Sequence, residues 1–135
     1  MANSISQIEG IGPANAKKLQ KCKIGSVGKL LKDGCTKKGR KEIASVSGID
    51  EGKVLKWVNM ADLFRIKGVA SEYSELLEAA GVDTVKELRN RNATNLHTKM
   101  EEINAKKKLV RRTPSSKQVD GFVKQAKKLK PMVTY

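Results

Sequence analysis

The sequence predicts an all-α fold of short helices arranged in two tandem pseudo-repeats. Side chains that favour helix N-termini recur at the start of short apolar runs along the chain. The apolar pattern of the first half returns 58 residues later, and no alternating strand pattern of useful length is present. Aromatic residues make up only 4% of the chain, so the predicted core is aliphatic.

The repeat is carried mostly by apolar positions, which indicates that a packing scheme has been duplicated. At an offset of 58, the matching pairs are Ile8 and Ile66, Gly10 and Gly68, Ile11 and Val69, Leu19 and Leu77, Ile24 and Val82, Val27 and Val85, and Leu30 and Leu88. The offset then drifts to 65, as loops of unequal length would produce. We therefore expect a first repeat over 1–62, a second over 63–130 and a tail over 131–135, all in one compact unit.

The first repeat begins with a capping-box pattern. Ser4 and Gln7 have the spacing of that motif and predict a helix that ends near Glu9. Gly10 suits the left-handed residue after a helix, and Pro13 suits the first position of the next one.

The remaining helices are predicted from further capping residues. Ser26, Thr36 and Asp50 precede the next three apolar runs of the first repeat. In the second repeat, capping boxes are predicted for two pairs, Thr84 with Glu87 and Ser115 with Gln118, and Thr94 is expected to correspond to Thr36.

The Gly-Ile-Gly turn at residues 10–12 predicts an anion site. Two glycines leave the outer surface of the turn without side chains, while Ile11 points inward. Backbone N–H groups of the turn and of the following helix then point outward and attract a phosphate. Lys17 and Lys18 follow within reach of a neighbouring phosphate.

This stretch resembles the helix-hairpin-helix motif of DNA repair and recombination proteins. The residues at the motif positions are Ile8, Gly10, Ile11, Gly12, Ala16 and Leu19. The resemblance implies binding of DNA backbone phosphates without sequence readout, with a monovalent cation at Gly10–Gly12 as the one cofactor it allows. The tandem arrangement, with "MADLFRIKGVASEYSELLEAAGVDTVKELRNRNATNLH" and the ending "KPMVTY", also resembles an uncharacterised bacterial family of such helical hairpins.

Two related turns depart from the motif. The turn after Ile66 has Ala70 in place of the second glycine, and Glu72, Glu75 and Glu78 follow it, which favours a structural role. The third turn places Asp50 after Gly48 and Ile49, and we interpret Asp50 as a helix cap that replaces an anion; Lys53 and Lys56 leave phosphate binding open there.

Charge is concentrated in two terminal blocks. The net charge is +14: residues 1–41 hold ten basic and two acidic residues (+8), 42–105 hold eight and eleven (−3), and 106–135 hold ten and one (+9). Such blocks imply nucleic acid first and an anionic membrane second. Because lysine predominates, backbone contacts are favoured over base readout. Besides Gly10, Ile11 and Gly12, the predicted binding residues are Lys17, Lys18, Lys21, Lys37, Lys38, Arg40, Lys41, Lys106, Lys107, Lys108, Arg111 and Arg112.

No catalytic set is indicated. The single His97 cannot complete a zinc site with Cys22 and Cys35, so we expect no metal site, and no GKS or GKT phosphate loop occurs. The N-terminus lacks a signal-peptide pattern and no apolar run is long enough for a membrane span. These features predict a cytoplasmic protein that is not an enzyme and has no membrane partner; association with the nucleoid is one option that this prediction leaves open.

The expected function is therefore binding of nucleic acid through its phosphates, with double-stranded DNA preferred and no sequence specificity. The alternative is an architectural or adaptor protein whose basic ends dock on structured RNA or on an acidic protein, with the hairpins serving only as packing units. A solvated lysine surface without a ligand also stays open, and the oligomeric state is not indicated.

Overall fold

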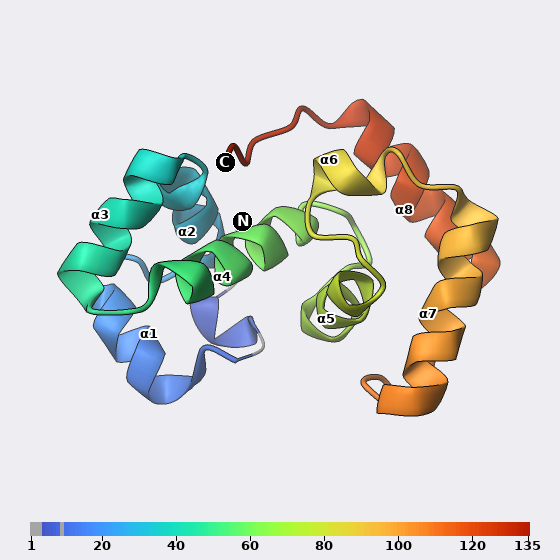
Figure 1. Cartoon of the computed structure of the whole chain (residues 1–135), viewed down its shortest axis with the longest axis horizontal. Helices are drawn as coiled ribbons and strands as arrows, with labels where there is room; N and C mark the ends of the chain where they lie inside the picture. The colour runs from blue at the N-terminus through green and yellow to red at the C-terminus, as the bar shows by residue number, and fades with distance from the viewer. Residues whose placement is uncertain (1–3, 9) are drawn as a thin grey trace. The chain divides into compact units, whose positions relative to one another are not determined.

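The computed structural model describes residues 4–8 and 10–135, and every regular element in them is helical (Figure 1). The predicted all-α fold class is confirmed. The chain divides into two compact units: unit 1 is Met1–Asp62 with Met132–Tyr135, and unit 2 is Leu63–Pro131. Within the described residues, no helix combines the length and apolarity needed to cross a membrane.

Unit 1 packs short helices around an aliphatic core and one tryptophan. Leu19, Ile24, Leu30 and Val58 are fully buried, and Trp57 is 3% exposed. Helix α3 packs against both α1 and α2. The elements are η1 (Ile5–Gln7, a 3-10 turn), α1 (Gly12–Gln20), α2 (Val27–Gly34), α3 (Lys37–Ser47) and α4 (Glu51–Leu63).

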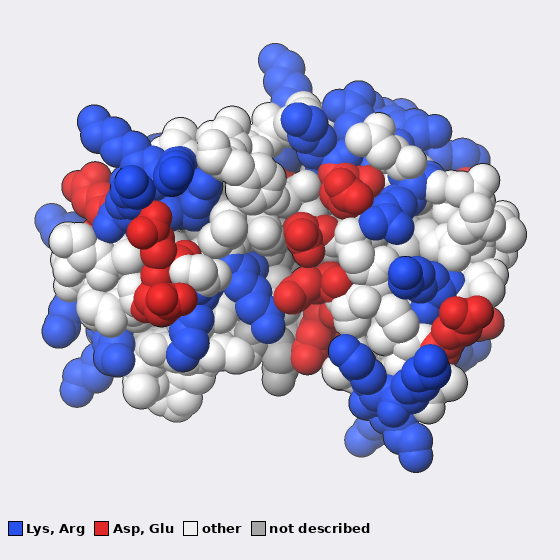
Figure 2. Space-filling model, viewed as in Figure 1, with Lys and Arg blue, Asp and Glu red and all other residues white. Residues whose placement is uncertain are grey.

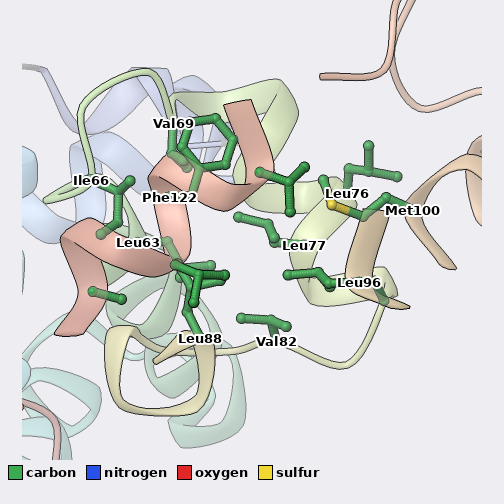
Figure 3. Close-up of a cluster of buried hydrophobic side chains, with 14 of the residues drawn as sticks. Leu63, Ile66, Val69, Leu76, Leu77, Val82, Leu88, Leu96, Met100 and Phe122 are labelled. Atoms are coloured by element: carbon green, nitrogen blue, oxygen red, sulfur yellow. The ribbon is translucent and has the colours of Figure 1, made fainter. Parts of the chain in front are cut away.

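Unit 2 has its own aliphatic core, to which Phe122 adds one aromatic ring (Figure 3). Leu76, Leu77, Leu88 and Met100 are fully buried there. Helix α7 packs against α5 and α8. The helices are α5 (Ser71–Ala79), α6 (Val85–Leu88), α7 (Ala93–Lys107) and α8 (Ser116–Lys128).

Backbone hydrogen bonds also recur at the 58-residue offset. The amide of Ile8 donates to the Ile5 carbonyl at 3.0 Å, and the amide of Ile66 donates to the Leu63 carbonyl at 3.1 Å. Four further equivalent bonds follow: Ile11 to Ile8 and Val69 to Ile66, then Ile24 to Leu19 and Val82 to Leu77. The repeated apolar spacing therefore corresponds to repeated local geometry.

Most of the predicted helix caps are confirmed. Ser26 Oγ, Thr84 Oγ1 and Asp50 Oδ2 each accept a hydrogen bond from the amide three residues on. Ser115 and Gln118 form a complete capping box. Thr36 Oγ1 likewise accepts from the Gly39 amide at 3.1 Å.

Three local predictions need correction. Ser4 caps only a three-residue 3-10 turn and accepts from the Ser6 amide, because the segment is too short for an α-helical capping box; Glu9, the predicted helix end, lies outside the described residues. Pro13 is the second residue of α1. Asn92, and not Thr94, caps α7, since α6 is four residues shorter than α2 while the loop that follows α6 is two residues longer.

Lys23 adopts a left-handed backbone, with φ 61°, at the position where unit 2 has Gly81, with φ 93°. A side chain is disfavoured there because its Cβ approaches the backbone. Lys23→Gly is therefore expected to stabilise unit 1 by about 0.5–1 kcal/mol, measured as a higher midpoint of chemical denaturation. Lys21→Gly is the matched control, because it removes the same charge from an ordinary right-handed position with φ −61°. A midpoint that rises equally in both variants would assign the gain to charge and not to strain.

Candidate nucleic-acid interface

The Gly-Ile-Gly turn is built on two buried isoleucines. Ile8 and Ile11 are each 1% exposed and fix the turn to the core of unit 1. Gly10 and Gly12 are exposed and have φ 92° and φ 65°, so both occupy the left-handed region. A Cβ on Gly12 would meet no atom within 4 Å, so the space beside this residue is open.

The N-terminus of α1 differs from most others in the described residues. Six α-helices have a side-chain cap, supplied by Ser26, Thr36, Asp50, Thr84, Asn92 and Ser115. Among the described residues, no side chain caps α1 or α5, the two helices that follow a repeat turn. The first turn of α1 contains no acidic residue, whereas that of α5 contains Glu72. Uncapped N–H groups and the helix dipole favour an anion at α1, and Glu72 already supplies negative charge at α5.

Three predicted lysines lie along or just beyond α1. Lys17 and Lys18 are exposed in its last turn, and Lys21 is exposed immediately after it. At a rise of about 1.5 Å per residue, Lys18 lies about 9 Å along the helix axis from Gly12. The lysines therefore extend the positive surface away from the turn.

Three more predicted lysines lie on α3, which packs against α1. Lys37, Lys38 and Lys41 are exposed, and the first two occupy the first turn of the helix. Figure 2 shows Lys and Arg side chains spread over the visible face of unit 1, with a few acidic side chains between them.

Arg40 does not belong to this exposed set. It is only 4% exposed, and its guanidinium donates to the carbonyls of Gly34, at 2.9 Å, and Thr134. Its Cζ lies 5.9 Å from the centre of the Tyr135 ring. The Thr134 amide also donates to the Cys35 carbonyl at 2.8 Å. Arg40 thus holds the last residues of the chain on unit 1 and is unavailable to a phosphate on the surface.

The second predicted cluster lies in unit 2, at the end of α7 and in the following loop. All five residues of this cluster are exposed: Lys106, Lys107, Lys108, Arg111 and Arg112. Figure 2 shows basic side chains gathered at this end of α7, while acidic side chains gather over α5.

The second repeat turn lacks the open geometry of the first. Gly68 keeps the left-handed backbone, with φ 93°, but Ala70 is extended, with φ −125°. A Cβ on Gly68 would lie 3.1 Å from the Phe122 ring, and a Cβ on the equivalent Gly10 would lie 3.7 Å from Trp57 Nε1. The two turns therefore differ in openness at the second glycine position and not at the first. Only the first repeat presents two exposed left-handed glycines.

The third turn is shaped as predicted. Gly48 ends α3 with φ 77°, Ile49 is buried, and Asp50 Oδ2 accepts from the Lys53 amide at 3.3 Å. The carboxylate of Asp50 therefore occupies the place that an anion would take.

The cysteines and the histidine do not form a reactive or metal-binding group in the described part of the chain. Burial raises the pKa of the Cys22 thiol, and the nearby carboxylates of Asp33 and Glu42 raise the pKa further, so this thiol stays protonated at neutral pH. His97 Nε2 lies 3.3 Å from Glu101 Oε1 one helical turn away. Among the described residues, no cluster of three or more His, Cys, Asp or Glu side chains is placed to hold a metal ion.

These features define a small, strongly basic, all-helical protein of two compact units, each of which contains a glycine turn followed by a helix without a side-chain cap. The chain belongs to the family described as a domain of unknown function, DUF4332, whose model matches residues 9–129. No curated protein and no solved structure gives a significant match.

Proposed function

We propose that this protein binds nucleic acid through its backbone phosphates, with double-stranded DNA preferred and without reading sequence. In this proposal the first repeat turn is a helix-hairpin-helix element. One phosphate lies against the backbone of Gly10–Gly12 and the first turn of α1, and lysines of α1 and α3 contact its neighbours.

The single observation that carries the proposal is the contrast between the two repeat turns. Both are fixed by equivalent hydrogen bonds, yet only the first has two exposed left-handed glycines and a following helix with no acidic residue in its first turn. Because the shared packing needs only the first glycine of each turn, packing alone does not account for Gly12. An anion held by backbone N–H groups does account for it.

The type of charge supports backbone contacts. The exposed cations of unit 1 in the proposed interface are all lysines: Lys17, Lys18, Lys21, Lys37, Lys38 and Lys41. Lysine attracts phosphate as a point charge, whereas bidentate recognition of a guanine edge favours arginine. The scarcity of aromatic side chains argues against stacking of single-stranded bases as the main mode of binding.

A titration against three ligands tests the proposal. We expect a short DNA duplex to bind more tightly than a structured RNA hairpin or polyglutamate at the same salt concentration, and two duplexes of unrelated sequence to bind equally, as measured by fluorescence anisotropy. Tightest binding to RNA or to polyglutamate would instead support an adaptor that docks on those partners. Absence of binding to all three would overturn the proposal.

A further inference from the structure

The connection between α7 and α8 is an expanded version of the turn between α3 and α4. In unit 1, only Gly48 and Ile49 stand between the last residue of α3, Ser47, and the helix cap Asp50. In unit 2, the seven residues 108–114 stand between the last residue of α7 and the cap of α8. Added loop residues on a repeated scaffold are a common place for function.

The added loop is held in one conformation by Asn104. The carbonyl of Asn104 accepts from the Lys108 amide at 2.8 Å. Its side-chain oxygen accepts from the Val110 amide at 2.9 Å, and its side-chain nitrogen donates to the Val110 carbonyl at 3.1 Å. The side chain of Val110 is buried, at 7% exposed, and anchors the middle of the loop to the core of unit 2.

A second anchor holds the far end of the loop. The hydroxyl of Tyr73, on α5, donates to the Arg112 carbonyl at 3.3 Å, and the Tyr73 ring lies 6.3 Å from that of Phe122. Pro114 is buried before α8 begins. The loop is therefore tied to its own unit at its start, middle and end.

All the charged residues of the anchored loop are basic. Between Glu102 and Asp120 the chain contains no acidic residue. Glu72 is the acidic residue that lines the hollow of about 500 Å³ beside Lys108 and Arg111. The exposed cations of this segment are Lys106, Lys107, Lys108, Arg111 and Arg112.

We infer that the α7–α8 loop is a second phosphate-binding element, distinct from the Gly10–Gly12 turn, and that Asn104 is its positioning residue. The ligand is the phosphodiester backbone of a nucleic acid, so the inference rests on the proposed function. Asn104 touches no phosphate in this account. Holding the backbone of Lys108, Arg111 and Arg112 in one arrangement, next to Lys106 and Lys107 of α7, lowers the entropy lost when these residues contact phosphates together.

A double-mutant cycle tests this inference. The loop variant changes Lys106, Lys107, Lys108, Arg111 and Arg112 to Gln, and Asn104→Ala is made in the wild-type chain and in that variant. In the wild-type chain, Asn104→Ala is expected to weaken duplex DNA binding about three- to tenfold, because two hydrogen bonds that position the loop are lost. In the loop variant, Asn104→Ala is expected to cause no further loss of DNA affinity, since the cations that Asn104 positions are absent. Asn95→Ala, an exposed change on the same helix, is the control and should leave affinity unchanged.

Each remaining outcome counts against a defined part of the account. An equal loss from Asn104→Ala in both backgrounds would show that Asn104 acts through something other than the loop cations. If wild type and the loop variant bind DNA equally, the loop is not a binding element. A wild-type protein that binds no nucleic acid overturns the proposed function itself. If Asn104→Ala lowers the thermal midpoint, Tyr73→Phe replaces it in the cycle, because it removes the second anchor of the loop and keeps the ring, and the same pattern of losses is expected.

Discussion

The affinity of the protein for duplex DNA is expected to fall on the order of 10³-fold when the salt concentration rises from about 50 to about 200 mM, if about six phosphates are neutralised. The reason is that each lysine or arginine that contacts a phosphate releases condensed counterions, and added salt opposes that release. Fluorescence anisotropy with one labelled duplex, repeated at several salt concentrations, gives the slope.

The slope also separates the two proposed elements. Removing the five cations at the end of α7 and in the α7–α8 loop should make the slope shallower by up to about 0.9 for each phosphate contact that is lost. The Gly10–Gly12 turn and the lysines of α1 and α3 should still bind the same duplex, so the affinity of this variant should still fall with salt, but less steeply. A wild-type affinity that does not change with salt would contradict phosphate contacts as the source of binding.

Gly12→Val is expected to weaken duplex binding about tenfold, because valine at φ 65° carries a strain of about 1–2 kcal/mol that is relieved by rotating the turn. The rotation moves the outward N–H groups away from the phosphate. Ala70→Val is the matched control, since its extended backbone accepts a β-branched side chain without strain. Affinity is measured after circular dichroism has shown that both variants keep their helices.

The comparison of Gly12→Val with Ala70→Val is not complicated by a steric clash at residue 12. A Cβ at residue 12 enters open space, so the expected loss comes from backbone geometry and not from repacking of the core. Equal losses in the two variants, or an unchanged affinity for Gly12→Val, would return the first turn to a purely structural role.

Local features of the fold could be predicted from the sequence because they depend on neighbours along the chain. A helix cap needs only one polar side chain and an amide three residues on. The positions of Ser26, Thr84 and Ser115 just before apolar runs were therefore enough to predict their caps. The repeat could be predicted since apolar residues that pack in the same way recur at the same spacing. Thr94 was matched wrongly to Thr36 because the helix and loop before α7 together are two residues shorter than those before α3, which shifts the register of the repeat.

Features that depend on distant parts of the chain could not be predicted. Arg40 lies in a basic run of the kind that is typical of an exposed surface. It is buried in the structure, where it donates a hydrogen bond to the carbonyl of Thr134, 94 residues away. The hydrogen bonds of Asn104 to Val110 need the actual course of the loop, which composition does not define. A sequence signal for the loop did exist: the drift of the repeat offset from 58 to 65 showed that residues had been added between the helices.

Amide chemical shifts of the intact protein, recorded by nuclear magnetic resonance while a short DNA duplex is added, test the central claim most directly. We expect the largest changes at the amides of Gly10, Ile11, Gly12 and Ala14 and in the α7–α8 loop over residues 108–112, with small changes at the equivalent turn of residues 68–71. Large changes at the second turn or along α5, with none at residues 10–14, would contradict that claim.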